Sequence, residues 1–223
     1  ELYGKLREDK AYSRHPGSLY RVFVRLGYRK KAESTKKKSK HNGKYDTPKE
    51  LGIKWQMDVK YVPSACYVGT DGEKFFQYTV IEEASRKRFI FAYKEQSSYS
   101  SVDFFRRAIL FFGYAPETIQ TDNGSEFNHT QKTTRIHPFD AFCNEIHVQH
   151  KTIRPRTPWH NGKVERSHRN DQERFYNHLK FYSFEDLQIQ MKRYLYRSNN
   201  IPTAVLAWLS PSQRHKMLAA EFI

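Results

Sequence analysis

The chain has 223 residues, of which 38% are hydrophobic, so it can form one substantial domain and a small one and is not a disordered chain. Its net charge of +15 is uneven, because residues 1–45 hold fourteen Lys or Arg against four acidic residues. Cys66 and Cys143 lack Cys-x-x-Cys spacing, and the longest apolar run, 108–115, is too short to cross a bilayer, which argues against a disulfide framework, a zinc finger and a membrane protein.

The cationic amino-terminal end favours a polyphosphate partner. Each phosphate that a basic side chain neutralises releases condensed counterions, so a concentrated positive charge binds nucleic acid well. A solvated tail is the alternative explanation, and we favour nucleic acid. No signal peptide is visible, and because the chain begins at Glu1 rather than at a methionine we expect residues to precede it.

The first thirty residues are predicted to be helical. One helix face is indicated by the spacing of Leu19, Val22, Phe23 and Leu26. Ser18 is a suitable N-cap and Gly27 a suitable stop. With a preceding helix at 2–10, this segment resembles the end of a helix-turn-helix DNA reader, in which Arg21 and Arg25 would contact DNA. A basic amphipathic helix packed on its own domain is the alternative.

Residues 31–49 form a basic linker with little to bury. Its run Lys36, Lys37 and Lys38 is expected to lie along a phosphate backbone.

Strands and helices then alternate in a pattern typical of a mixed sheet flanked by helices. The sequence predicts strands at 53–62, 74–82, 87–94, 117–121 and 147–151, the first three as an antiparallel meander. It predicts helices at 98–112, 138–146, 162–180 and 184–197, with an irregular tail that becomes helical from Pro211.

Three carboxylates lie on three separate elements of this pattern. Asp58 lies within the first strand, Asp122 follows the fourth, and Glu165 lies in the first turns of a helix that Asn161 could cap. Strand ends and helix starts meet at one edge of such sheets, so these acids are candidates for a shared metal site. Each alone is better explained as a cap, turn or ion-pair residue.

The residues around these acids resemble the DDE integrase core of insertion-sequence transposases and retroviral-type integrases. The resemblance covers about residues 50–212. Its matching pieces are Trp55-x-x-Asp58, Thr121-Asp122-Asn123-Gly124-x-Glu126-Phe127, Pro155-x-x-Pro158-x-x-Asn161-Gly162-x-x-Glu165-Arg166, Asn200-x-Pro202, Leu206 and Ser210-Pro211.

The resemblance implies an α/β fold, a ribonuclease H-like mixed five-stranded sheet flanked by helices. With the helical head and the basic linker, this core divides the chain into a helix-turn-helix-like remnant, a basic linker, a catalytic core and a tail, at 1–30, 31–49, 50–198 and 199–223. The triad Asp58, Asp122 and Glu165 would hold two Mg²⁺ or Mn²⁺ ions, which suit all-oxygen ligands. Glu82 stands where many relatives carry Asp and is not expected to be a ligand.

The activity implied is that of a transposase: metal-dependent cleavage at the ends of a mobile DNA element, then strand transfer by two-metal phosphoryl transfer. The partners would be double-stranded DNA, as element ends and target, and further copies of the chain. A cytoplasmic, nucleoid-associated protein of bacterial type is expected, with no membrane association. The 43-residue interval from Asp122 to Glu165 is long for the family, which predicts an exposed insertion at 128–137.

Basic and polar side chains on and before the Glu165 helix form a predicted DNA-contacting stripe beside the metals. Its members are Arg154, Arg156, Asn161, Lys163, Arg166, Asn170 and Arg174. A solvated helix face is the alternative for several of them.

Three other functions stay open at this point. A ribonuclease H-like nuclease that only hydrolyses would use the same triad. A DNA-binding protein that kept the fold and lost the chemistry is a second possibility, against which all three carboxylates count. An RNA-binding module is disfavoured because no aromatic signature for stacked bases is visible.

Overall fold

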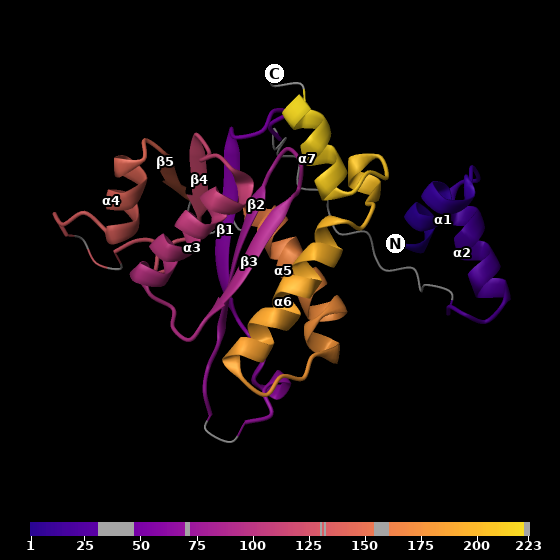
Figure 1. Ribbon diagram of the computed structural model, residues 1–223, viewed down its shortest axis with the longest axis horizontal. Helices are drawn as coiled ribbons and strands as arrows, with labels where there is room; N and C mark the ends of the chain where they lie inside the picture. Colours follow the sequence, from indigo (N-terminus) through magenta and orange to yellow (C-terminus); the bar gives the residue numbers. More distant parts are fainter. Residues whose placement is uncertain (31–46, 70–71, 130, 132, 154–160, 221–223) are drawn as a thin grey trace.

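The structure is a computed structural model that describes residues 1–30, 47–69, 72–129, 131, 133–153 and 161–220. A five-stranded sheet lies at its centre, with helices on both faces (Figure 1). The strands are β1 (Lys54–Tyr61), β2 (Phe76–Glu82), β3 (Arg88–Tyr93), β4 (Thr118–Thr121) and β5 (Gln149–Thr152). The helices are α1 (Leu2–Lys10), α2 (Pro16–Arg25), α3 (Ser98–Phe112), α4 (Pro138–Glu145), α5 (Gly162–Arg174), α6 (Phe184–Asn199) and α7 (Pro211–Ala220).

The strand order is β3-β2-β1-β4-β5. The first three strands form the predicted antiparallel meander, and β4 and β5 run parallel to β1. This is the predicted mixed five-stranded α/β arrangement. The parallel pairing of β1 with β4 matters most for function, because it brings two strands that are distant in sequence side by side.

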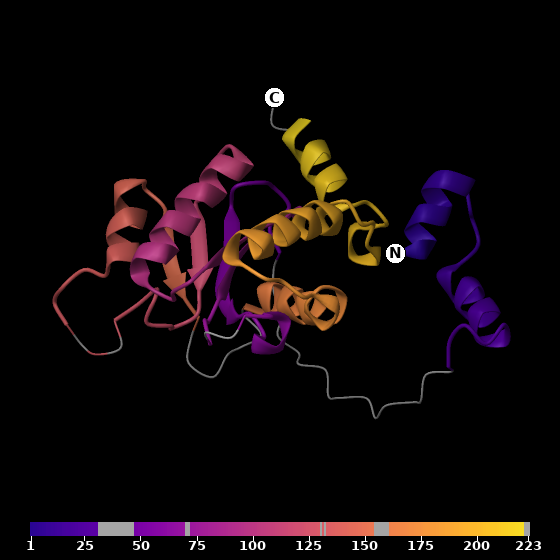
Figure 2. The same cartoon turned by 60° about the horizontal axis from the view of Figure 1, so that its bottom comes forward.

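Alternation along the strands separates two different faces of the sheet. Trp55 and Met57 of β1 point into the larger apolar core, which α3 and α4 cover. The intervening residues Gln56 and Asp58 face α5, which contacts β1 and β2. A second apolar core, built around Leu187 and other residues of α6, completes that side. Figure 2 shows α3 and α4 on the side of the sheet opposite α5 and α6.

The amino-terminal helix pair contacts the carboxyl-terminal part of the chain. The rings of Tyr3 and Trp208 lie 4.3 Å apart between centroids, and Arg197 binds the Glu1 carboxylate at 3.0 Å. A side chain at Gly4 would meet the Pro202 ring at 2.6 Å, so this close approach requires glycine. The predicted head and tail segments are therefore in contact with each other.

Two predicted helix boundaries are wrong. The helix expected to begin after Ser18 begins at Pro16, and the ring nitrogen of His15 accepts the cap hydrogen bond from the Gly17 N–H. Proline suits the first helical position because the N–H that it lacks would have no intrahelical partner there. The helix expected over 162–180 ends at Arg174, where Phe175 turns inward to stack on Tyr194.

Two further expectations can be compared with the structure. The described residues of 128–137 lie outside helices and strands and are mostly exposed, as expected for an insertion. Among the described residues, no helix is both long and apolar enough to span a bilayer. The predicted linker lies almost wholly outside the described residues.

Candidate active site

Asp58 lies on β1 and faces α5, where its carboxylate is largely covered. Its Oδ1 accepts a hydrogen bond from the Val59 N–H at 2.9 Å. Burial is the main cause that raises the pKa of Asp58, to about 8. The negative charges of Asp122, Glu165 and Glu126 raise it further. This carboxyl group thus senses two other acids of the predicted triad.

Asp122 is placed by the end of β4. The parallel register pairs Lys54 with Thr118 and Gln56 with Gln120, and continuing it by two residues sets Asp122 beside Asp58. The Asp122 carboxylate accepts a hydrogen bond from the Gly124 N–H at 3.0 Å, which closes the turn.

The residue before Asp122 is fixed by a chain of polar contacts. Thr121 Oγ1 lies 2.8 Å from His150 Nε2, and His150 Nδ1 lies 2.5 Å from Asp140 Oδ1. Because Asp140 belongs to α4 and His150 to β5, these contacts tie the end of β4 to its neighbours.

Glu165 occupies the first turn of α5 and is exposed. Burial raises its pKa and the charge of Arg169 lowers it, with a net rise. Asn161 holds the N-cap position, but its side chain makes no cap hydrogen bond. Instead Gln56 Oε1 accepts from the N–H groups of Lys163 and Val164, at 3.1 and 3.3 Å. A glutamine from β1 therefore caps the helix that carries Glu165 and links it to the strand that carries Asp58.

His168, one turn after Glu165, is a site residue that the sequence analysis missed. Its Nδ1 lies 3.4 Å from Asp58 Oδ2, and its Nε2 lies 3.2 Å from Thr79 Oγ1. Burial lowers the pKa of His168 to about 4. The only available signal was its position at i+3 from Glu165, which puts both residues on neighbouring parts of one helix face.

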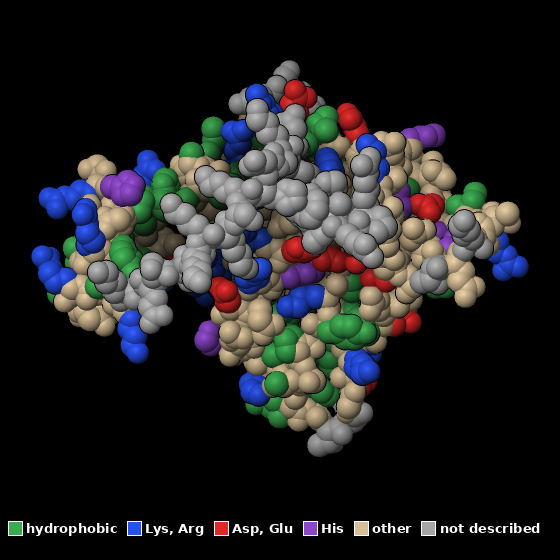
Figure 3. All heavy atoms as spheres, turned by 180° about the vertical axis from the view of Figure 1, so that it is seen from behind, with side chains coloured by type: hydrophobic (Ala, Val, Ile, Leu, Met, Phe, Trp, Pro, Cys, Tyr) green, Lys and Arg blue, Asp and Glu red, His purple; other side chains and the backbone are tan. Residues whose placement is uncertain are grey.

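Glu126 also belongs to the neighbourhood of Asp58. It is buried, and Gln96 Nε2 donates to its Oε1 at 2.6 Å. Figure 3 shows acidic side chains gathered near the middle of one face of the molecule, with a histidine beside them.

The donor set fits a hard divalent cation. Carboxylate oxygens are the ligands that Mg²⁺ and Mn²⁺ prefer, and a cation relieves the repulsion that raises the pKa of Asp58. Within the described part of the chain, however, no three His, Cys, Asp or Glu side chains converge closely enough to hold a metal ion as they stand. The three acids form an electrostatically coupled group, and the two-ion centre stays a prediction.

Comparison with known proteins assigns the chain to a family. Residues 48–158 and 146–201 match two families that are both described as "Integrase core domain". The chain belongs to the integrase core family. Its core resembles the HTLV-2 integrase catalytic core domain in complex with magnesium (dimeric form), with a TM-score of 0.54 and 20% identity over 74% of this chain and 97% of that one.

A second solved structure and two curated proteins agree with this assignment. A simian T-cell lymphotropic virus intasome in complex with PP2A regulatory subunit B56 gamma gives a TM-score of 0.62 at 17% identity, covering 95% of this chain and 73% of that one. "Putative integrase ORF3" of Spiroplasma virus SpV1-C74 is 32% identical over 170 residues, 72% of this chain and 46% of that protein. The retrovirus-related Pol polyprotein from transposon TNT 1-94 of Nicotiana tabacum is 29% identical over 140 residues, 60% of this chain and 10% of that protein. The chain spans less than half the length of these curated relatives.

In this integrase core, Glu82 has a structural position. It is buried, and its carboxylate accepts hydrogen bonds from the N–H groups of Ala84 and Ser85 and from the Ser85 hydroxyl. These bonds hold the turn between β2 and β3, in line with the expectation that Glu82 is not a ligand.

A buried ion pair anchors α5 behind Glu165. Asp171 is fully buried and binds the Arg88 guanidinium at 2.7 Å. Gln77 Nε2 and the Tyr194 hydroxyl donate to the same carboxylate, at 2.7 and 3.0 Å. Burial alone would raise the pKa of Asp171, but the charge of Arg88 and these hydrogen bonds hold it below its usual value.

The predicted DNA-contacting residues fall into different environments. Arg21 and Arg25 are exposed on α2, whereas Lys36, Lys37, Lys38, Arg154 and Arg156 lie outside the described residues. The Lys163 ammonium binds the buried carboxylate of Glu83. Burial is the main cause that lowers the pKa of Lys163, to about 8. Lys163 is therefore partly committed to an internal ion pair.

Asn161 is buried, and its Oδ1 has no hydrogen-bond partner among the residues that the structure describes. Arg166, Asn170 and Arg174 line a cleft between α5 and α2. Because these three residues are four positions apart, they share one face of α5, and helix geometry turns that face well away from Glu165. These three members of the predicted stripe therefore lie on a different face of α5 from Glu165, and DNA contact by the stripe stays a prediction.

Proposed function

We propose that this integrase core is a polynucleotidyl transferase of a mobile DNA element. It would hydrolyse a phosphodiester at each element end and then join the freed 3′-hydroxyl to target DNA. Its partners would be double-stranded DNA, as element ends and as target, and further copies of the chain. The structures that it resembles include a dimeric integrase core and an intasome, which supports an oligomer on DNA.

The observation that carries this proposal is the coupling of the Asp58 carboxyl group to Asp122 and Glu165. Three elements far apart in the sequence bring these acids within electrostatic range. A protein that needed only to bind DNA would gain nothing from acids that repel one another beside a phosphate-binding surface, because each negative charge opposes the ligand.

Asp58, Asp122 and Glu165 are the residues that would hold divalent cations. Such ions stabilise developing charge on phosphoryl oxygens and lower the pKa of a bound hydroxyl group. The protein's own contribution is to set the positions of the acids. Gln56 fixes the start of α5, His168 contacts the Asp58 carboxylate, and the Asp140–His150–Thr121 contacts hold the end of β4.

The test uses labelled duplex oligonucleotides that carry the element's ends, a circular plasmid as target, and Mg²⁺ or Mn²⁺. Wild-type protein is expected to yield shortened end strands and plasmid joined to the oligonucleotide. Glu165→Gln should abolish both products. Glu145→Gln is the matched control, because Glu145 is exposed at the end of α4 and away from the triad.

The products distinguish the remaining functions. Shortened strands without joined plasmid would replace the proposal with a hydrolytic nuclease. Duplex binding that is unchanged by Glu165→Gln, with no product from either protein, would point to a DNA-binding protein without catalytic activity.

A further inference from the structure

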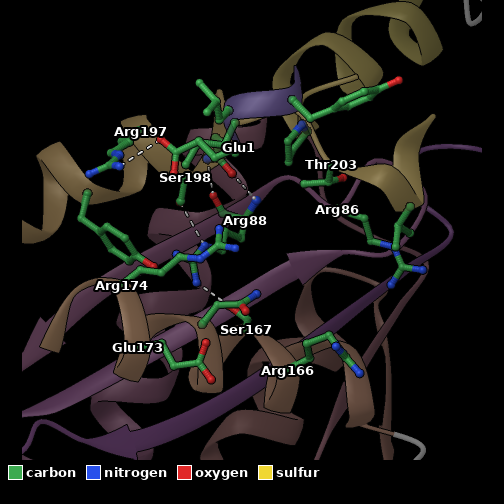
Figure 4. A pocket seen from close by; sticks show the side chains of 18 of the residues that line it. Glu1, Arg86, Arg88, Arg166, Ser167, Glu173, Arg174, Arg197, Ser198 and Thr203 are labelled. Atoms are coloured by element: carbon green, nitrogen blue, oxygen red, sulfur yellow. Dashed lines mark hydrogen bonds and ion pairs between the residues drawn. The ribbon is translucent and has the colours of Figure 1, made fainter. Parts of the chain in front are cut away.

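A large cleft separates α2 from α5 and α6. Its volume is about 1240 Å³, beyond the roughly 300–1,000 Å³ of a small-molecule pocket. One wall carries the apolar and aromatic side chains of α2 and the following turn, among them Leu19, Phe23 and Tyr28. The opposite wall carries arginines. Figure 4 labels Arg86, Arg166 and Arg174 among the residues that line this cavity.

The cleft is separate from the candidate active site although it shares α5 with it. Arg166, Asn170 and Arg174 lie on the cleft face of that helix. His168 lies on the face that meets β1, and the charge of Glu165 raises the pKa of Asp58 on that strand. A ligand in the cleft would thus lie along the same helix as Glu165, on its other side.

The arginines around the cleft have two kinds of environment. Arg88 and Arg197 are paired with Asp171 and Glu1, so their charges are already compensated. Arg166 and Arg174 are exposed on α5, and within the described part of the chain neither takes part in an ion pair. The exposed Glu173 also lines this wall, and Arg166 and Arg174 together leave it a net positive charge that an anionic ligand can neutralise.

The wall formed by α2 presents ring surfaces. None of the residues of α2 is fully buried, and its apolar side faces the cleft rather than a core. The rings of Phe23 and Tyr28 meet edge to face with centroids 6.2 Å apart, and Tyr28 is 75% exposed. Exposed aromatic faces opposite a basic wall are the combination that binds unpaired nucleotides, because bases stack on the rings while arginines hold the phosphates.

We propose that this cleft binds a short segment of single-stranded DNA, with phosphates on Arg166 and Arg174 and bases against Phe23 and Tyr28. A duplex keeps its bases stacked inside, so it could use the arginines but not the rings. The origin of the single strand rests on the proposed function, since cleavage at an element end frees a strand beside α5. The binding itself does not depend on catalysis.

The experiment measures fluorescence anisotropy of a labelled oligothymidylate and of a blunt duplex of the same length, in EDTA, with the full chain. Arg174→Glu tests the basic wall and Tyr28→Ala the aromatic wall. Arg193→Glu is the matched control, because Arg193 is an exposed arginine of α6 that does not line the cleft. Thermal denaturation of each variant checks that the fold is kept.

Compared with wild type, Arg174→Glu is expected to bind the single strand about tenfold more weakly. Tyr28→Ala is expected to bind it at least about fivefold more weakly. Arg193→Glu should stay within about twofold of wild type, and Tyr28→Ala should leave duplex binding unchanged. The proposal is overturned if both cleft variants match the control, or if duplex and single strand lose affinity equally in Tyr28→Ala. Because this binding experiment contains no divalent ion, a negative result would leave the cleavage proposal intact. If the chain binds the single strand normally but does not cleave, only the cleavage proposal fails.

Discussion

Asp58 and Asp171 are two largely covered aspartates on opposite sides of the contact between the sheet and α5, and they behave in opposite ways. Asp171 meets Arg88, Gln77 and Tyr194, and these partners keep its pKa below the usual value. Asp58 meets a histidine and the fields of three other acids, and its pKa rises to about 8. Burial raises the pKa of both carboxyl groups, but the neighbouring charges have opposite signs, so the net shifts are opposite.

The difference distinguishes a structural acid, Asp171, from Asp58, the acid that we propose to be functional. The network around Asp171 is complete within the protein and fixes the position of α5. The negative charges around Asp58 are unfavourable by themselves, and either a proton on Asp58 or a bound cation relieves their repulsion. Strongly perturbed carboxylates that lack a protein cation are candidates for function.

The largest effect is expected from removing the charge of Asp58. Asp58→Asn should lower end cleavage by on the order of a thousandfold, because one lost carboxylate ligand removes several kcal/mol of charge stabilisation at the phosphoryl group. Its stability without metal should not fall, since the repulsion with Asp122 disappears. Rates of strand cleavage and urea denaturation measure the two quantities. If Asp58→Asn lowered the free energy of unfolding but left the cleavage rate unchanged, the assignment of the two aspartates would be reversed.

Asp171→Ala should show the opposite pattern. Leaving the Arg88 guanidinium buried without its partner should cost about 3–5 kcal/mol of unfolding free energy. Urea denaturation measures this change. The control is Asp103→Ala, which breaks a half-exposed pair with Arg107 and should cost less than about 1 kcal/mol. Equal losses in the two variants would show that the buried network does not anchor α5.

His168→Ala should lower cleavage by about 10- to 100-fold, the usual effect of losing a group that orients a ligand residue. The divalent-ion concentration for half-maximal activity should rise as well, which a purely structural effect would not cause. His168→Asn should restore part of the activity, because its amide can donate to Asp58. His178→Ala, which changes an exposed histidine beyond α5, is the control. An unchanged ion dependence in His168→Ala would exclude the positioning role.

The smallest effect concerns pH. Asp58 has a folded-state pKa above its unfolded value, so its contribution to stability falls as pH rises from about 4 to about 8. His168 has a lowered pKa, so its contribution rises with pH up to its unfolded value near 6.5. Below pH 6.5 the contributions of Asp58 and His168 to stability oppose each other. From pH 6.5 to pH 8 the free energy of unfolding of the metal-free protein should fall, relative to that of Asp58→Asn, by at most about 1.4 kcal/mol per pH unit.

Urea denaturation at several pH values, with and without Mn²⁺, tests this. Saturating Mn²⁺ should remove the decline if the acids bind the ion. A decline that persists in Asp58→Asn would have another origin.

Local patterns already identified much of this molecule. The strand predicted at 53–62 is found at Lys54–Tyr61. The helix predicted at 98–112 is found at Ser98–Phe112, where Gly113 ends it with a positive φ of 83°. The meander also followed from short turns between strands. These features depend on residues close together in the chain, and so they can be inferred from it.

Other features depend on contacts between distant residues. That His168 meets Asp58, that Gln56 caps α5, and that Arg166 and Arg174 face α2 could not be inferred from spacing. Each depends on how α5 is rotated against the sheet, which the buried pair Arg88–Asp171 helps to fix. Helix periodicity indicates which residues share a face but not what that face meets.

The amino-acid order was therefore sufficient for the family and the mixed sheet, and it nominated the three acidic residues as a prediction, because motifs and periodicity are local properties of the chain. Folding in three dimensions settled which charges surround each acid and which side of α5 meets the cleft. The reason is physical: burial and the electric field at a carboxylate come from neighbours that only chain packing assembles.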